Sequence, residues 1–352
     1  MTRVGILGAG FIARAHAAAY ASLPGIELAV VADPRAGAAE ALARAYGARA
    51  ATSAEAVWES DVEVVSVCTP TPTHVDLSLA GLRAGKHVLC EKPIAGDVVE
   101  AEALVAGARE AEARGVRFMV GHVSRFEADH LRAKELLDRG DIGPLAMAHQ
   151  SITGSFPEWS SEGWFADAAK SGGPLVDLAI HSFDYLSWLF AEPVERVSVA
   201  GVRSKLAFPT YALTTLRFVS GRIATVEVSW AHTRSDGFNV RTELTGTRGR
   251  IAWTYRDIAA MRVSRGDSPV QEIIMPGENS FAAEIKAFID AIRADKPVPV
   301  PAEEALAALR IAAAANESLA RGTPVSLAPV TAARAAHARQ AIVHPTDEAV
   351  GR

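Results

Sequence analysis

The sequence predicts an α/β protein in which a doubly wound parallel sheet is followed by a second α/β domain with an antiparallel or mixed sheet. In the first third, short apolar β-branched runs alternate with longer amphipathic segments rich in Ala, Glu and Leu, a pattern typical of βαβ units. After residue 121 apolar and polar residues alternate within the runs, and turn signals separate them. This second pattern indicates strands that are solvated on one face.

Length and composition exclude several classes of protein. The chain has 352 residues, more than one ordinary hydrophobic core holds, which predicts two domains. Its 36 Lys and Arg against 41 Asp and Glu give a net charge of −5, which argues against nucleic acid or a membrane as the partner. Only two cysteines, no secretory leader and no long apolar segment predict a cytoplasmic protein.

The predicted elements divide the chain into a dinucleotide-binding domain (1–121), a second domain (122–327) and a tail (328–352). The tail is either a bare extension or a helix that docks on a neighbouring subunit. In the first domain we expect strands at 4–7, 28–32, 62–68, 87–90 and 116–120, and helices at 36–46, 74–84 and 98–113. In the second we expect helices at 129–139, 174–190, 281–293 and 302–319, and strands at 145–153, 194–202, 211–218, 222–231, 239–245 and 250–255.

A glycine-rich turn lies between the first strand and the first helix. Gly8, Gly10 and Ala13 occupy the small-residue positions of the G-x-G-x-x-G/A fingerprint of dinucleotide-binding folds. Gly8 permits a tight turn, and Gly10 lets the backbone approach a pyrophosphate whose charge the helix N-terminus stabilises. We therefore expect a dinucleotide in contact with Gly8, Gly10, Phe11 and Ile12.

An acidic residue at the end of the second strand indicates which dinucleotide binds. Asp33 is placed so that its carboxylate can bind both ribose hydroxyls and repel a 2′-phosphate, which favours NAD over NADP. Arg35 softens that repulsion and is expected beside the cofactor as well. A structural glycine turn with a capping Asp33 is the alternative to this interpretation.

Two further loops follow strands of the same predicted sheet. Thr69 and Pro70 begin a proline-bearing loop that ends where His74 opens a helix; it either forms a wall beside a cofactor ribose or simply ends the strand. Glu91 and Lys92 come directly after the strand at 87–90, where a lysine faces the place of the nicotinamide. All five residues are expected to contact the cofactor, although a Lys-Pro pair also occurs in ordinary exposed loops.

A polar stripe marks the predicted helix at 174–190. Asp177, His181 and Asp184 follow one another at helical spacing and share one face of such a helix, while apolar residues fill much of the rest. Three such side chains are compatible with a metal site, but nothing in the sequence requires a metal and we predict none. A core histidine that is hydrogen-bonded to Asp184 is the other alternative.

The glycine turn at 8–13, Glu91-Lys92-Pro93 and Asp177-x-x-x-His181, in this order, resemble the glucose–fructose oxidoreductase, inositol dehydrogenase and rhizopine-catabolism (Gfo/Idh/MocA) family. The resemblance covers residues 3–327 and includes 121–126 and 322–325. It implies an N-terminal Rossmann domain and a C-terminal α/β domain with an open sheet that often serves oligomer contacts. The chemistry it implies is reversible hydride transfer between a nicotinamide and a carbon of a polyol or sugar.

The resemblance also implies roles for single residues. Lys92, Asp177 and His181 correspond to the catalytic residues: His181 takes the hydroxyl proton, Lys92 orients the same oxygen and Asp177 binds substrate hydroxyls. An imidazole suits this role because it titrates near neutral pH. His122, Arg125 and Trp164 match segments near the substrate, although Phe165 replaces an arginine that is frequent after this tryptophan. A domain-interface ion pair or hydrogen bond is the alternative for His122 and Arg125.

Three functions are compatible with these residues. The leading hypothesis is an NAD-dependent dehydrogenase that acts on a cyclic polyol or sugar. The alternative is an NAD-dependent glycosidase that oxidises its substrate transiently and eliminates the leaving group. A non-catalytic nicotinamide-binding regulator is the third, and the intact catalytic residues argue against it. The resemblance further implies a homodimer or homotetramer; Trp230 and Trp253 lie either on an exposed sheet face or in the core.

Overall fold

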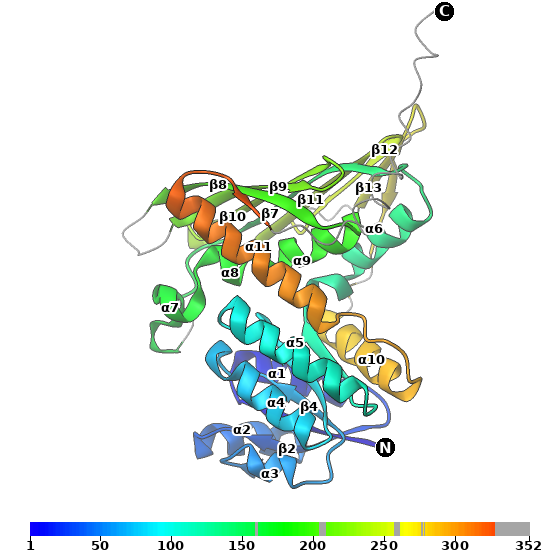
Figure 1. The fold of residues 1–352 in the computed structure, drawn as a ribbon. Coiled ribbons are helices and arrows are strands. Elements are labelled where there is room, and N and C mark those ends of the chain that lie inside the picture. The colour runs from blue at the N-terminus through cyan, green and yellow to red at the C-terminus, as the bar shows by residue number, and fades with distance from the viewer. Residues whose placement is uncertain (159–160, 204–208, 257–260, 276, 278, 328–352) are drawn as a thin grey trace, which may run out of the picture. The chain divides into compact units, whose positions relative to one another are not determined.

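The computed structural model describes residues 1–158, 161–203, 209–256, 261–275, 277 and 279–327, and it contains two compact units (Figure 1). The first unit comprises Met1–Leu131 and Pro276–Ala313, and the second comprises Arg132–Met275 and Ala314–Arg352. The predicted domain boundaries after residues 121 and 327 stay a prediction. The predicted tail, 328–352, lies outside the described residues.

The first unit is built on a six-stranded sheet in which every neighbouring pair of strands is parallel. In the strand order β3-β2-β1-β4-β5-β6, successive strands are added on one side of β1 as far as β3 and on its other side from β4 onward, as in a doubly wound fold. This order confirms the predicted fold class. The strands are β1 (Thr2–Leu7), β2 (Ile26–Ala32), β3 (Arg49–Ala51), β4 (Val64–Val67), β5 (His87–Glu91) and β6 (Phe118–Gly121). The helices are α1 (Phe11–Ser22), α2 (Ala36–Tyr46), α3 (Glu55–Trp58), η1 (Thr71–Thr73), α4 (His74–Arg83), α5 (Val98–Glu112), η2 (Val123–Phe126) and α10 (Ser280–Arg293).

These strands are buried on both faces, which explains why their sequences are continuous apolar runs. All four residues of β4 are buried, and so are the last four of β1. Helices cover the sheet, and α10 packs against α1 although it comes from the far end of the sequence. Because the strands run parallel, the segments that follow β1, β2, β4, β5 and β6 all emerge at one edge of the sheet.

The second unit is built on a nine-stranded mixed sheet of order β14-β13-β12-β11-β7-β10-β9-β8-β15. Among the described strands of this sheet only β7 and β10 pair in parallel, so the predicted mixed sheet is confirmed. The strands are β7 (Leu145–Thr153), β8 (Val194–Arg203), β9 (Pro209–Phe218), β10 (Ile223–Ser229), β11 (Asn239–Gly246), β12 (Gly249–Thr254), β13 (Met261–Arg265), β14 (Gln271–Ile273) and β15 (Val325–Ser326). The helices are η3 (Ser161–Ala166), α7 (Ala168–Ser171), α8 (Pro174–Asp177), α9 (Ala179–Phe190) and η4 (Arg234–Asp236); α6 (Ala128–Asp138) and α11 (Ala302–Arg321) cross the division between the units.

The two faces of the mixed sheet differ in what covers them. On one face α9 contacts β7 and β10, and Phe190 stacks on Phe218 of β9 with their ring centroids 4.1 Å apart (Figure 1). The opposite face bears Met147, Leu213 and Ile223, whose exposed fractions are 48%, 38% and 41%. Trp230 and Trp253 are buried, so the alternative that they form an exposed sheet face is wrong.

The prediction of one continuous helix over 174–190 is also wrong. The segment forms α8 and α9, which are separated at Leu178. The backbone N–H of His181 donates to the carbonyl of Leu178 at 3.2 Å, a bond one residue shorter than that of an α-helix, so the chain tightens here. Asp177 therefore ends one helix and His181 lies in the first turn of the next. The face that both were expected to share is not a face of one regular helix.

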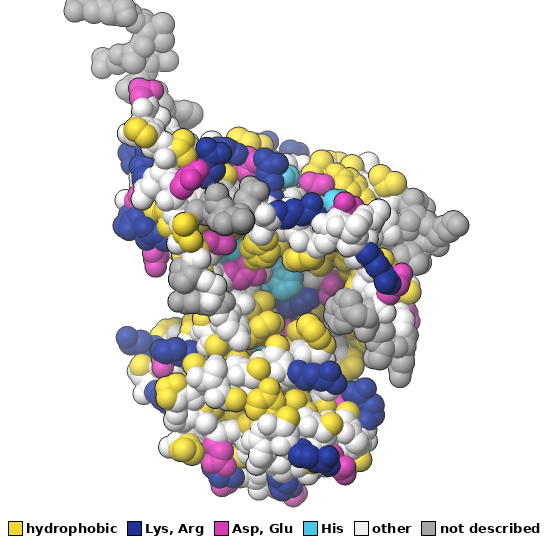
Figure 2. Space-filling view, turned by 180° about the vertical axis from the view of Figure 1, so that it is seen from behind, with side chains coloured by type: hydrophobic (Ala, Val, Ile, Leu, Met, Phe, Trp, Pro, Cys, Tyr) yellow, Lys and Arg dark blue, Asp and Glu magenta, His cyan; other side chains and the backbone are white. Residues whose placement is uncertain are grey.

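The face drawn in Figure 2 mixes charges of both signs, and the described helices carry no membrane signal. In the face that Figure 2 shows, Lys and Arg side chains are interspersed with Asp and Glu side chains, as the small net charge leads one to expect. None of the helices in the described part of the chain combines the length and the apolarity that crossing a membrane requires.

Candidate active site

The glycine turn leaves room for a pyrophosphate. Gly8 has a φ of +96°, and a Cβ atom there would lie 2.5 Å from the carbonyl oxygen of Cys68, so the turn excludes larger residues. At Gly10, the N-cap of α1, no atom lies within 4 Å of such a Cβ. The first turn of α1 carries no acidic residue and no side-chain cap, which suits an anion at this helix N-terminus. Phe11 is 65% exposed beside this space, and Ile12 is half-buried.

Asp33 ties the glycine turn to the end of β2. Its Oδ2 accepts hydrogen bonds from the backbone N–H of Ala9 and from Nη2 of Arg35, both at 2.9 Å, and its Oδ1 accepts from the N and Nε of Arg35. Burial opposes the carboxylate, but these bonds and the arginine charge outweigh it and lower the pKa of Asp33. The side chain is thus an anion that holds the turn in shape, with the guanidinium of Arg35 exposed beside it.

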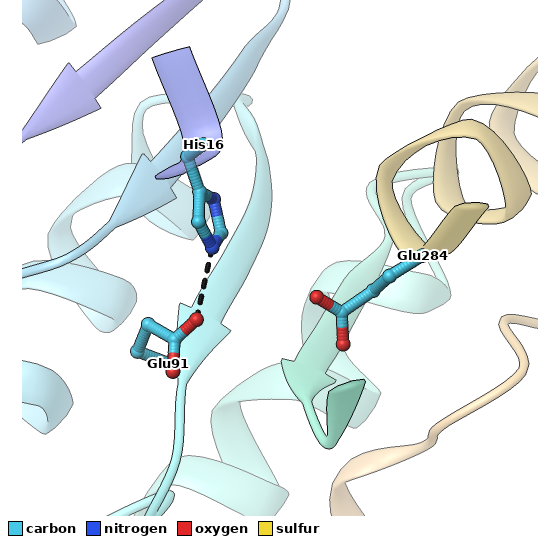
Figure 3. A group of neighbouring side chains, drawn as sticks. All are labelled: His16, Glu91 and Glu284. Carbon is cyan, nitrogen blue, oxygen red and sulfur yellow. Dashed lines mark hydrogen bonds and ion pairs between the residues drawn. The ribbon is translucent and has the colours of Figure 1, made fainter. Parts of the chain in front are cut away.

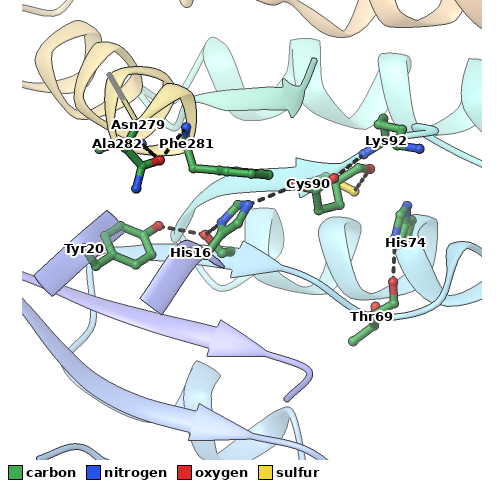
Figure 4. A network of polar contacts seen from close by, with 11 residues as sticks. His16, Tyr20, Thr69, His74, Cys90, Lys92, Asn279, Phe281 and Ala282 are labelled. Atoms are coloured by element: carbon green, nitrogen blue, oxygen red, sulfur yellow. Dashed lines mark hydrogen bonds and ion pairs between the residues drawn. The ribbon is translucent and has the colours of Figure 1, made fainter. Parts of the chain in front are cut away.

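The loop after β4 is held by its own side chains. Thr73 donates from its hydroxyl to Oγ1 of Thr69 at 2.7 Å and to the carbonyl of Pro70 at 2.8 Å. His74 is only 1% exposed, and one ring nitrogen lies against the backbone carbonyl of Thr69 (Figure 4). The other ring nitrogen lies against the carbonyl of Pro93. Its ring is fully engaged within the protein, and its expected contact with the cofactor stays a prediction.

The backbone of Lys92 is bonded to a buried polar network that was not predicted from the sequence. The carboxylate of Glu91 bonds to Nε2 of His16 at 2.9 Å and accepts the backbone N–H of Lys92 at 3.2 Å. The other ring nitrogen of His16 bonds to Ser66 at 2.9 Å, and Ser66 bonds to the hydroxyl of Tyr20 at 2.7 Å (Figure 4). The peptide bond between Lys92 and Pro93 is cis, and Lys92 itself is half-buried.

Electrostatics keep Glu91 charged although it is buried. Burial raises the pKa of its carboxyl, but the hydrogen bond from His16 and the charges of His16, Lys92 and His74 lower it by more. The pKa of Glu91 is therefore lower than usual. Its side chain points away from the surface, and its expected contact with the cofactor stays a prediction. The only sequence signal of the network is the pair His16 and Tyr20 at helical spacing in an Ala-rich helix.

A second buried carboxylate approaches this network. Glu284 of α10 points toward the His16–Glu91 pair, and ligand atoms of the three residues lie within 4.8 Å of one another (Figure 3). Such a group has the composition of a metal site. Two of these ligand atoms, Nε2 of His16 and Oε1 of Glu91, bond directly to each other, so the group forms a polar network.

The remaining candidates of the first unit are buried. His122 follows β6 and is fully buried. Arg125 is 3% exposed and donates to the Glu304 carboxylate at 2.6 Å and to the carbonyl of Pro299 at 3.4 Å. The guanidinium is therefore engaged in an ion pair inside the first unit, and a contact of His122 or Arg125 with substrate stays a prediction.

In the second unit, two glycines precede the candidate catalytic residues. Gly172 and Gly173 both have positive φ, and the N–H of Gly173 donates to the hydroxyl of Ser171 at 3.1 Å, which shapes the start of α8. Asp177 and His181 follow, and both are half-buried. Trp164 packs against the buried cluster of Phe165 and Trp230 and is also half-buried.

Comparison with known proteins decides the family. Residues 2–122 match the family described as "Oxidoreductase family, NAD-binding Rossmann fold", and residues 134–327 match "Oxidoreductase family, C-terminal alpha/beta domain". The chain belongs to the Gfo/Idh/MocA family. The expected family and fold class are thereby confirmed, and the protein is an NAD-dependent oxidoreductase.

Relatives of this Gfo/Idh/MocA protein include inositol dehydrogenases. The inositol 2-dehydrogenase of Rhizobium meliloti is 32% identical over 337 residues, which cover 93% of this chain and 99% of that protein. The scyllo-inositol 2-dehydrogenase (NAD(+)) of Bacillus subtilis is 29% identical over 342 residues, 92% of this chain and 96% of that protein. A crystal structure of a myo-inositol dehydrogenase from Corynebacterium glutamicum has a TM-score of 0.80 at 26% identity, covering 94% of this chain and all of that one (100%).

The residues at the sheet edge fit NAD. The open space at Gly10, the uncapped first turn of α1 and the anionic Asp33 at the end of β2 are what a pyrophosphate and a ribose diol require. These residues of the Gfo/Idh/MocA protein would hold the adenosine half of the cofactor.

The two glycines of the turn separate stability from cofactor binding. We expect Gly10→Ala to leave the unfolding temperature within about 3 °C of wild type, because its methyl group enters open space, but to weaken NAD binding at least about tenfold. Gly8→Ala should instead lower the free energy of unfolding by about 1–3 kcal/mol, because of its φ and its clash with Cys68. Thermal unfolding and calorimetric titration with NAD measure both. Wild-type NAD affinity in Gly10→Ala would contradict the assignment.

Proposed function

We propose that the protein is a dehydrogenase that transfers a hydride between NAD and a hydroxyl-bearing carbon of a cyclic polyol or sugar, with an inositol as the first substrate to test. One observation carries the proposal: Asp33, the glycine turn and Lys92 follow β2, β1 and β5 at one edge of one sheet. A dinucleotide that lies along this edge with its adenosine at Asp33 brings its nicotinamide toward Lys92. The names of the relatives supply the substrate class.

The chemistry assigns a task to each catalytic residue. Bound NAD supplies the acceptor for the hydride. Loss of a hydride from a carbinol carbon makes its hydroxyl proton acidic, so a base must take that proton, and we assign this task to His181. Lys92 donates to the same oxygen and stabilises the negative charge that develops there. Asp177 accepts hydrogen bonds from substrate hydroxyls. The reaction yields a ketone, NADH and one proton.

The alternative of a glycosidase is not favoured. A transient oxidation would use the same hydride acceptor and would also need a base to drive elimination of the leaving group. The relatives reported above are dehydrogenases by name. We also propose a cytoplasmic location, in keeping with two buried free cysteines, of which burial raises the pKa of Cys68 well above its usual range.

We further infer that the open face of the mixed sheet binds a second copy of this chain. Met147 and Ile223 stand directly opposite each other on β7 and β10, and Leu213 stands opposite Glu227 on the neighbouring strand. Half-exposed apolar side chains thus lie side by side with polar ones on a face that no described helix covers. Such a surface, apolar at the centre and mixed around it, suits a symmetric interface.

Catalysis by His181 is tested by substitution. We expect wild-type protein to reduce NAD in the presence of myo- or scyllo-inositol, and His181→Ala to lower kcat by about 10²–10⁴ because the base is lost. NAD affinity should remain within twofold of wild type. His87→Ala is the control, because His87 lies at the N-terminal end of β5 and Lys92 follows its C-terminal end. NADH absorbance measures the rates, and an unchanged kcat in His181→Ala would refute the role.

The inferred binding of a second copy is tested by a substitution on the open face. Ile223→Lys places a charge in the apolar part of this face, and we expect it to shift the protein to a monomer at micromolar concentration. Light scattering coupled to size-exclusion chromatography measures the mass. Val99→Lys is the control, since Val99 is an exposed apolar residue of α5 in the other unit. A wild-type monomer, or a dimer that survives Ile223→Lys, would contradict the inference.

A further inference from the structure

We infer that His74 is a positioning residue that is held as an imidazolium: its ring bridges two backbone carbonyls and thereby fixes the loop that carries Lys92. The electrostatic part of this inference stands on the geometry of the first unit alone. Its consequence for catalysis rests on the proposed function of Lys92.

The two partners of the ring determine its charge. Nδ1 of His74 lies 2.8 Å from the carbonyl oxygen of Pro93, and Nε2 lies 2.9 Å from that of Thr69. A carbonyl oxygen only accepts hydrogen bonds, so each ring nitrogen must donate. A neutral imidazole carries one N–H and makes one of these bonds, whereas an imidazolium makes both. At 1% exposure no bulk water replaces the missing donor.

Leaving one bond unmade is costly in this place. A neutral ring would set the lone pair of one nitrogen against a carbonyl oxygen at less than 3 Å. A buried polar group without its partner costs about 1–3 kcal/mol. The charged form therefore gains from both carbonyls at once, in addition to the greater strength of a hydrogen bond from an ionised donor.

The surroundings of the ring favour the same form. Burial opposes the charge, but the charge interaction and the hydrogen bond with the Cys90 side chain, together with the bonds to the carbonyls of Pro93 and Thr69, favour it more. The net effect raises the pKa of His74 to about 9. Among the described residues, β5 contributes Cys90 and the anionic Glu91 to this region, and Lys92 follows them. The charge of His74 in turn helps to lower the pKa of Glu91, so the cation and the anion stabilise each other.

The bridge holds Lys92 through its neighbour on the C-terminal side. Pro93 receives the bond from Nδ1, while Glu91 accepts the backbone N–H of Lys92. Lys92 is thus fixed on one side by the network of His16 and on the other by His74. The second bond of the ring ends on Thr69, in the loop after β4. One side chain therefore joins the loop that carries the lysine to a loop assigned to the cofactor.

The sign of the pH dependence follows from the raised pKa. The unfolded state has the ordinary histidine pKa of about 6.5, and the folded state has a pKa of about 9. The contribution of His74 to stability is thus fully present below pH 6.5 and is lost as the pH rises through 9. Positioning of Lys92 depends on the charge in the folded state, so it should be lost only as the pH passes about 9.

The charge is measured directly by NMR. In protein labelled with ¹³C and ¹⁵N at histidine, we expect the ring of His74 to show two protonated nitrogens at pH 7.5 and to titrate with a pKa of about 9. Assignment through couplings to its own backbone needs no variant and no substrate. A ring that is neutral at pH 7.5, or that titrates near pH 6.5, would overturn the inference even if the enzyme is fully active.

The positioning role is measured by kinetics. His74→Gln removes the charge but keeps N–H donors, and we expect it to lower kcat with an inositol about ten- to a hundredfold, while KM and NAD affinity stay within threefold. The wild-type kcat should fall as the pH passes 9, and this fall should be absent in His74→Gln. His74→Phe, which keeps no donor, should be slower still.

A matched control lies one helical turn further along α4. Ser78 is fully buried, and its hydroxyl has no hydrogen-bond partner among the described residues, so Ser78→Ala should keep kcat within twofold. Equal pH profiles of kcat in wild type and His74→Gln would refute the positioning role. If wild-type protein oxidises no polyol, the proposed function fails instead, and the NMR titration still decides the charge of His74.

Discussion

Because the six strands of the first sheet run parallel, every strand ends at the same edge, and the loops that follow must satisfy their own backbone there. The structure meets this constraint with buried charged side chains that bond to those loops. Asp33 accepts the N–H of Ala9, Glu91 accepts the N–H of Lys92, and His74 donates to Thr69 and Pro93. These bonds fix the backbone of the loops that follow β1, β4 and β5.

Buried charges of this kind are stable only when their bonds are complete. Asp33 has the guanidinium of Arg35 beside it, and Glu91 has the ring of His16. Removing one partner leaves a desolvated charge behind, so each of these side chains depends strongly on its neighbours. The lysine of a catalytic loop gains from such a support, because small shifts of a reacting group cost much rate.

Local patterns were sufficient to predict much of the molecule. The parallel sheet, the turn at Gly8 and the carboxylate at Asp33 follow from spacing along a few dozen residues. The bond between His16 and Glu91 spans 75 residues, and Glu284 reaches the same network from α10, so no local pattern marks them. The apolar pattern runs through Leu178 without a glycine or a proline, so no sequence signal marks the break there. Short edge strands such as β14 and β15 leave too few residues for a period to show.

The mixed sheet separates two tasks by its two faces. The covered face packs on α8 and α9, which carry Asp177 and His181, whereas the other face presents Met147 and Ile223. Successive side chains of a strand point to opposite faces of the sheet, so one strand can carry core residues on one face and surface residues on the other. β10 does this directly, with Val226 and Val228 in the core and Ile223 outside. The proposed assembly through the open face would therefore leave Asp177 and His181, on the covered side, away from the interface.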